Sequence, residues 1–142
     1  MASFETRSIT AETAQIAITA AAAKARQLGH AMSIAITDAS GVTTALLRMD
    51  GASQMTLDIA TDKAYTSATL GMATHALWDF VKKDPPLQHG LPSYPRVVTF
   101  GGGYPIIEDG ARIGAIGVSG GHYSDDMEVA RAGLAAIGAP VS

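Results

Sequence analysis

Lys63 is the residue of this chain whose position points most directly to chemistry. In the helix predicted over residues 53–70 it falls on the face that should meet the rest of the protein. A buried lysine must be paired or lose its charge, so it can hold an anion or act as a base or nucleophile. The structural alternative is that it reaches past the sheet edge to solvent, or pairs with Asp50. The predicted inward face consists of Ala52, Met55, Thr56, Ile59, Lys63, Thr66, Ser67 and Leu70.

His122 is the best placed of the four histidines for acid–base chemistry, because it follows two glycines and precedes a predicted helix. His30 follows a helix end and His75 lies at a helix start, so we predict structural or solvated roles for both. His89 lies in a proline-rich loop from which it could close over a ligand. Lys63 and His122 are therefore the candidate catalytic residues.

Three charged side chains are candidates for holding a ligand. Arg48 and Asp50 end a predicted strand and share one of its faces, because they are two residues apart. They could line the mouth of a pocket or simply pair with each other. Arg112, in the last predicted strand, is a further cation that could hold a carboxylate.

The segment from residue 101 to residue 121 contains eight glycines and leads into a helix. Its spacing matches neither the dinucleotide fingerprint nor a Walker A loop. Ser119, Gly120 and Gly121 form a turn before the helix, where anions can bind, but Asp125 and Asp126 in the first helical turn would repel a phosphate. We predict that the glycines let the alanine-rich helix of residues 10–28, or a second subunit, pack closely on the sheet, or let a ligand touch the backbone.

The elements that must position these residues combine hairpins with flanking helices. Residues 84–96 carry four prolines and no periodicity, which indicates a long loop. The pattern predicts an α+β domain with a mostly antiparallel sheet of about five strands. We expect helices over 10–28, 53–70, 74–83 and 124–137, and strands over 32–38, 42–50, 97–100, 104–108 and 111–119.

Composition limits the classes of function. The 142 residues are 47% apolar and 16% charged, which favours one domain over 1–142 with some surface buried in an oligomer. A net charge of −3 without a basic block argues against a nucleic-acid partner. The absence of cysteine excludes disulfides, iron–sulfur clusters and cysteine zinc sites. No signal-like start or membrane-length apolar run is present, so we expect a cytoplasmic protein without membrane contact.

Three stretches together resemble the GlcG/HbpS family, a haem-degrading-type family that includes the C-terminal domain of PduO proteins. They are RMDGA at 48–52, IATDKAYTSATLG at 59–71, and GGGYPIIEDGARIGAIGVSGG at 101–121, followed by an acidic helix start. The resemblance covers essentially the whole chain. It implies a profilin-like fold, assembly as a homo-oligomer, and functions that range from haem or iron binding to enzymes acting on products of aromatic ring cleavage.

The resemblance leaves haem ligation open, because the first predicted helix has no histidine to serve as an axial ligand. His122, a threonine or His30 then become conceivable ligands. The acidic residues near His122 match no metal-binding motif, so we predict no separate metal site.

Three hypotheses follow from these residues and the resemblance. In the first, a pocket between sheet and helix binds haem or another anionic molecule, whose carboxylates meet Arg48, Lys63 or Arg112. In the second, a cofactor-free lyase, deaminase or hydrolase acts on a small unsaturated carboxylate, and Lys63 or His122 moves a proton. In the third, the protein is an accessory oligomer without chemistry.

Overall fold

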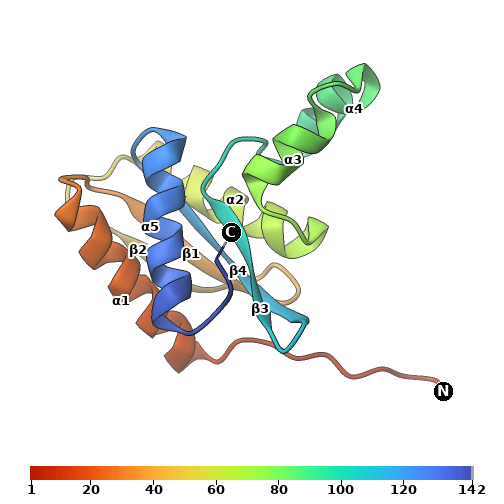
Figure 1. Cartoon of the computed structure of the whole chain (residues 1–142), viewed down its shortest axis with the longest axis horizontal. Helices are drawn as coiled ribbons and strands as arrows, with labels where there is room; N and C mark the ends of the chain where they lie inside the picture. The colour runs from red at the N-terminus through yellow and green to blue at the C-terminus, as the bar shows by residue number, and fades with distance from the viewer. Residues whose placement is uncertain (142) are drawn as a thin grey trace.

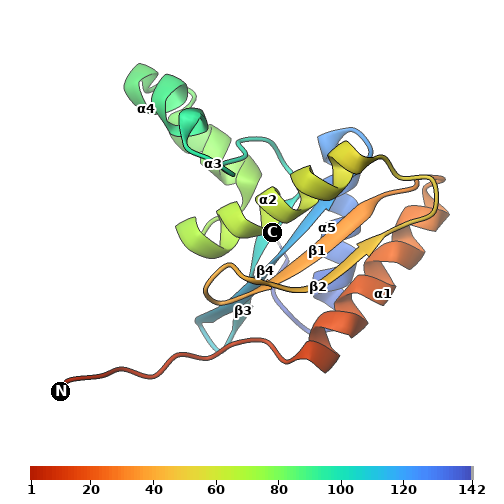
Figure 2. The same ribbon diagram turned by 180° about the vertical axis from the view of Figure 1, so that it is seen from behind.

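The computed structural model describes residues 1–141 and places three helices against one antiparallel sheet (Figure 1). The strand order is β2-β1-β4-β3. Helices α1 and α5 pack together on one face of the sheet, and α2 covers the other (Figures 1 and 2). The elements are α1 (Ala11–Gln27), β1 (Ser33–Asp38), β2 (Thr43–Arg48), α2 (Gln54–Leu70), α3 (Thr74–Val81), α4 (Pro85–Gly90), the 3₁₀ helix η1 (Leu91–Ser93), β3 (Gly103–Glu108), β4 (Ala111–Ser119) and α5 (Tyr123–Ala136).

The two sheet faces differ in the size of their side chains. Toward α1 and α5 the central strands present larger apolar residues such as Ile34 and Ile116, which form the main core. Toward α2 they present Ala35, Ala115 and Gly117, so the helix backbone comes very close to the sheet. A Cβ atom on Gly117 would lie 2.0 Å from the carbonyl oxygen of Ala60. The glycines of β4 therefore allow close helix packing, but the helix is α2 and not the alanine-rich helix of residues 10–28 that was predicted.

The α+β class is confirmed, but the sheet has four strands rather than five. Residues 97–100, which were predicted to be a strand, form no ladder. The proline-rich stretch also differs from the expected loop, because it contains α4 and η1. Asp84 caps α4 by accepting a hydrogen bond from the backbone N–H of Leu87, and Pro85 begins the helix with its φ already set.

The inward face predicted for α2 is partly wrong. Met55 is 69% exposed and Leu70 is also exposed, whereas Ala60, Ala64 and Ala68 are buried. The physical reason is the small-residue sheet face beneath α2, which leaves no room for large side chains and selects an alanine stripe.

Helices α3 and α4 project away from the sheet (Figures 1 and 2). Neither α4 nor η1 has a buried residue. The chain returns to the body at Arg96, which has a positive φ of 71° and is held by Asp62 through a hydrogen-bonded ion pair of 3.0 Å. Among residues 1–141, no helix combines the length and apolar character needed to cross a membrane.

Candidate functional site

Lys63 is buried, as predicted, and its partner is Asp126 on α5. The two side chains are 0% and 3% exposed, and Lys63 Nζ lies 2.9 Å from Asp126 Oδ2. Nζ also donates a hydrogen bond of 2.8 Å to the carbonyl oxygen of Val118, and the backbone N–H of Gly121 donates to Asp126 Oδ1. Burial lowers the pKa of Lys63 and raises the pKa of Asp126, while the attraction between the two opposes both shifts.

This ion pair joins α2 to the start of α5 across the end of β4. Gly102 leaves space for it, because a Cβ there would lie 2.6 Å from Lys63 Nζ and 2.7 Å from the Val118 carbonyl oxygen. The ring of Phe100 covers the remaining side, with its centroid 5.0 Å from Nζ. In this arrangement the lysine is satisfied by the protein itself, and a ligand would reach it only if Phe100 moved.

Phe100 also forms a wall of a hollow between α3 and α5, which we call the His75 pocket. Its volume is roughly 540 Å³, within the range of small-molecule sites. Aromatic and apolar side chains dominate its walls, and it opens to solvent. It is lined by His75, Trp78, Asp79, Thr99, Phe100, Gly101, Tyr123 and Met127.

His75 is the histidine of this pocket, whose lining also contains the carboxylate of Asp79. Its ring packs beside Tyr104, with centroids 5.4 Å apart. Nδ1 is buried without a hydrogen-bond partner, and within residues 1–141 Nε2 makes no hydrogen bond either. A structural or solvated role was predicted for His75, and this pocket was not predicted from the sequence.

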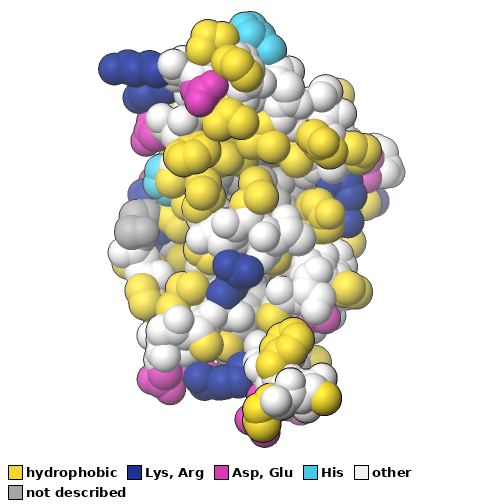
Figure 3. All heavy atoms as spheres, turned by 90° about the vertical axis from the view of Figure 1, so that its right-hand side faces the viewer, with side chains coloured by type: hydrophobic (Ala, Val, Ile, Leu, Met, Phe, Trp, Pro, Cys, Tyr) yellow, Lys and Arg dark blue, Asp and Glu magenta, His cyan; other side chains and the backbone are white. Residues whose placement is uncertain are grey.

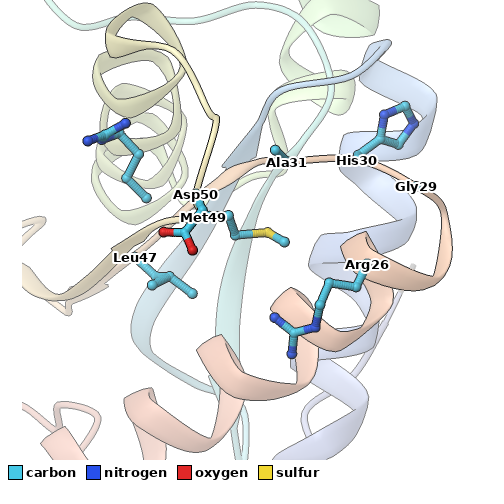
Figure 4. Close-up of a pocket in the computed structure, with 8 residues that line it drawn as sticks. Arg26, Gly29, His30, Ala31, Leu47, Met49 and Asp50 are labelled. Carbon is cyan, nitrogen blue, oxygen red and sulfur yellow. The ribbon is translucent and has the colours of Figure 1, made fainter.

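Arg48 and Asp50 line a second hollow of roughly 520 Å³, the Arg48 pocket (Figure 4). Within residues 1–141 they form no ion pair with each other; Arg48 Nη1 instead donates to the carbonyl oxygen of Ala52 at 2.8 Å. Figure 4 shows Met49 pointing into the hollow, opposite Arg26. The full lining is Arg26, Gly29, His30, Ala31, Leu47, Arg48, Met49 and Asp50.

His122 lies outside both pockets and caps α5. Its Nδ1 accepts a hydrogen bond of 3.2 Å from the backbone N–H of Ser124, and its ring packs on Tyr123. The structure therefore does not bring His122 to Lys63. His30 binds the other acidic residue of this turn, with Nε2 2.9 Å from Asp125 Oδ2.

The remaining candidates are spread along β4 and the turn after it. Arg112 lies beside Gly71 at the start of the strand, about 20 Å from Val118 at the usual rise per residue. Ser119 is buried and pairs with Ser33 in the sheet. Gly120 and Gly121 are exposed and pack near Met32, behind the Arg48 pocket. Within residues 1–141 there is no cluster of three or more His, Asp or Glu side chains suited to a metal ion.

The family model described as "Haem degrading protein HbpS-like" matches residues 9–135. The chain belongs to this HbpS-like family. It is 41% identical over 120 residues to the corrinoid adenosyltransferase PduO of Salmonella typhimurium, which covers 83% of this chain and 35% of PduO. The chain thus spans about a third of the length of that relative.

Two solved structures extend the likeness within the HbpS-like family. The Klebsiella pneumoniae protein ORFY has a TM-score of 0.89 at 32% identity, covering 97% of this chain and 96% of ORFY. A complex described as PduOC with haem has a TM-score of 0.87 at 36% identity, covering 94% of this chain and 98% of PduOC. The family resemblance predicted from the sequence is confirmed.

Proposed function

We propose that this chain binds haem in the His75 pocket, with Nε2 of His75 as the iron ligand. The observation that carries the proposal is a half-buried histidine, with neither ring nitrogen hydrogen-bonded within residues 1–141, in a hollow walled by aromatic side chains. Family membership and the likeness to the PduOC–haem complex support haem as the ligand class. Imidazole is an established protein ligand for haem iron, as in globins and peroxidases.

The donor set and walls of the pocket fit the group. Trp78, Phe100 and Tyr123 present flat apolar surfaces that suit a porphyrin ring. Met127 supplies a thioether on the α5 side, a second group able to contact iron. Lys82, which follows α3, has its Nζ 3.1 Å from Oδ1 of Asp79 in the pocket lining and is a cation that could meet a propionate. The iron would supply the redox chemistry, and these residues would orient the ring and exclude water.

The unpartnered Nδ1 of His75 suggests that binding is reversible. A ligating histidine nearly always donates its other ring N–H to an acceptor, and loss of that acceptor typically weakens metal affinity 10–100-fold. Nδ1 of His75 has no acceptor within residues 1–141. We therefore propose exchangeable haem, as in a sensor or carrier, rather than a permanently held prosthetic group.

A hemin titration followed by absorption tests the proposal. The wild-type protein should shift and sharpen the Soret band, and the His75→Ala variant should lose that shift because the pocket loses its imidazole ligand. His122→Ala is the matched control, since His122 is an exposed histidine outside the pocket, and it should bind hemin as the wild type does. Equal spectra for wild type and His75→Ala would contradict the assignment of His75.

The Arg48 pocket favours a second candidate, a site for a small unsaturated carboxylate. Arg26 and Arg48 are cations at its wall, and Leu47 and Met49 give it apolar surface. If the protein is instead a cofactor-free lyase, deaminase or hydrolase, this pocket would be its substrate site. It is the weaker candidate, because Lys63 is enclosed and His122 lies elsewhere. The net charge of −3 supports small ligands rather than nucleic acid as partners, and a cytoplasmic location stays a prediction.

A further inference from the structure

We infer that Lys63 is a gated amine site for aldehydes and ketones. When the ring of Phe100 swings outward, a carbonyl compound in the His75 pocket reaches Lys63 Nζ and forms a Schiff base with it. This site goes beyond the proposed binding of haem and does not depend on it. Its basis is the geometry around Nζ, the way in which Phe100 is held, and the charges of the buried pair.

Lys63 Nζ has one N–H to spare. A lysine ammonium has three N–H donors, and within residues 1–141 those of Lys63 make two hydrogen bonds, to Asp126 Oδ2 at 2.9 Å and to the carbonyl oxygen of Val118 at 2.8 Å. The ring of Phe100 lies on the remaining side, with its centroid 5.0 Å from Nζ. Phe100 also lines the His75 pocket. One aromatic ring therefore separates the buried nitrogen from a hollow of roughly 540 Å³.

The side chain of Phe100 can move while the backbone on both sides of it stays fixed. Phe100 is 45% exposed, and its segment belongs to no strand. Before it, the backbone N–H of Val98 donates to Thr66 Oγ1 at 3.1 Å. After it, the backbone N–H of Gly103 donates to Thr74 Oγ1 at 2.9 Å. Rotation of the ring about its side-chain bonds breaks neither hydrogen bond, so the gate opens without unfolding the segment.

The charges behind the gate favour a neutral ligand over an anion. Asp126 already neutralises Lys63, and both side chains are buried. A carboxylate brought to Nζ would place a second negative charge beside Asp126, which is costly in a buried site. The oxygen of an aldehyde or ketone instead accepts the spare N–H without adding charge.

The surroundings of the gate favour an apolar carbonyl compound. Trp78, Tyr123 and Met127 line the pocket through which the ligand would enter. Apolar side chains also gather over the upper half of the view in Figure 3, where α3 and α4 lie. An aromatic or other apolar aldehyde matches these walls, because it buries its ring or chain there and turns its one polar atom toward Nζ.

The Lys63–Asp126 pair can move the protons that Schiff-base formation requires. Only an unprotonated amine attacks a carbonyl carbon. Burial lowers the pKa of Lys63 and raises the pKa of Asp126, so both shifts favour passage of a proton from Nζ to Oδ2. Nζ then bonds to the carbonyl carbon as the C=O double bond opens, and one amine proton passes to the oxygen. The resulting hydroxyl takes the proton held by Asp126 and leaves as water, which leaves a protonated Schiff base beside the Asp126 carboxylate.

Reductive trapping with benzaldehyde and sodium cyanoborohydride, read by peptide mass mapping, tests the site. The hydride reduces any Schiff base to a stable amine, so each trapped lysine gains one benzyl group. Phe100→Ala removes the gate, and the trapping rate at Lys63 should rise at least about tenfold, because a minor open state is commonly populated at 10% or less. Phe80→Ala is the matched control, since Phe80 is an exposed aromatic residue of α3 outside the pocket lining, and it should keep the wild-type rate.

Lys82 and Lys83 are internal references, because both are exposed and should be trapped equally in all three proteins. Circular dichroism checks the fold, and Phe100→Leu takes the place of Phe100→Ala if the alanine variant is unfolded. Trapping at Lys82 and Lys83 but not at Lys63 in the folded Phe100 variant would overturn the amine site. An equal rate at Lys63 with and without the Phe100 ring would overturn the gate. Hemin is absent from the experiment, so a failure of haem binding does not affect either result.

Discussion

Replacing Lys63 by methionine is expected to lower the free energy of unfolding by about 3–5 kcal/mol, the usual cost of breaking a buried ion pair by removing one partner. The variant keeps most of the side-chain volume but leaves Asp126 buried without its counter-charge. The carbonyl oxygen of Val118 also loses its lysine donor. Urea unfolding followed by circular dichroism measures the change.

Two further variants separate the buried charge from other effects. Lys82→Met removes an exposed pair with Asp79 and should change stability by less than about 0.5 kcal/mol. Lys63→Met combined with Asp126→Asn removes both charges and keeps an oxygen for the N–H of Gly121, so it should recover at least half of the loss. Equal, small effects of Lys63→Met and Lys82→Met would show that the buried pair does not hold α2 to α5.

Gly117→Ala is expected to destabilise the fold by about 3 kcal/mol or more, the upper end for overpacked cores. Its Cβ would lie 2.0 Å from the Ala60 carbonyl oxygen and 2.5 Å from the backbone nitrogen of Ala64. Both neighbours are backbone atoms, so relief requires moving α2 away from the sheet. That movement would also pull Lys63 away from Val118.

The control for this substitution is Gly90→Ala, because a Cβ at Gly90 meets no atom within 4 Å. Its stability should stay within about 0.5 kcal/mol of the wild type, as for most surface changes. The same urea unfolding experiment compares the two variants. A similar stability for both would mean that α2 does not pack as closely on β4 as the structure has it.

The order of helices and strands followed from the sequence because it depends on local patterns. The alternation of apolar with polar or small residues predicts the strands β1 and β2, and the Asp109–Gly110 turn predicts the β3–β4 hairpin. The inward face of α2 was predicted wrongly in part, because the sheet strands beneath it present glycine and alanine and accept only small side chains. The sequence pattern of one helix does not reveal which residues it packs against. Pro85 and Pro86 were predicted to be loop residues, but they begin α4.

The candidate site depended on contacts between distant parts of the chain. Burial of Lys63 was predictable from its helix face, but its partner Asp126 lies 63 residues away and was interpreted only as a helix-capping acid. His75 was missed because its pocket exists only when α3, residues 99–101 and α5 come together. The local sequence signal that could have indicated the site is His75 at the start of the short helix α3, one turn before Trp78 and Asp79.

A crystal structure of the wild-type protein with bound hemin tests the central claim most directly. We predict that the porphyrin lies between α3 and α5 against Trp78, Phe100 and Tyr123, with its iron bonded to Nε2 of His75. Hemin bound elsewhere, such as in the Arg48 pocket, or in the predicted pocket with iron bonded to a different residue, would contradict the account.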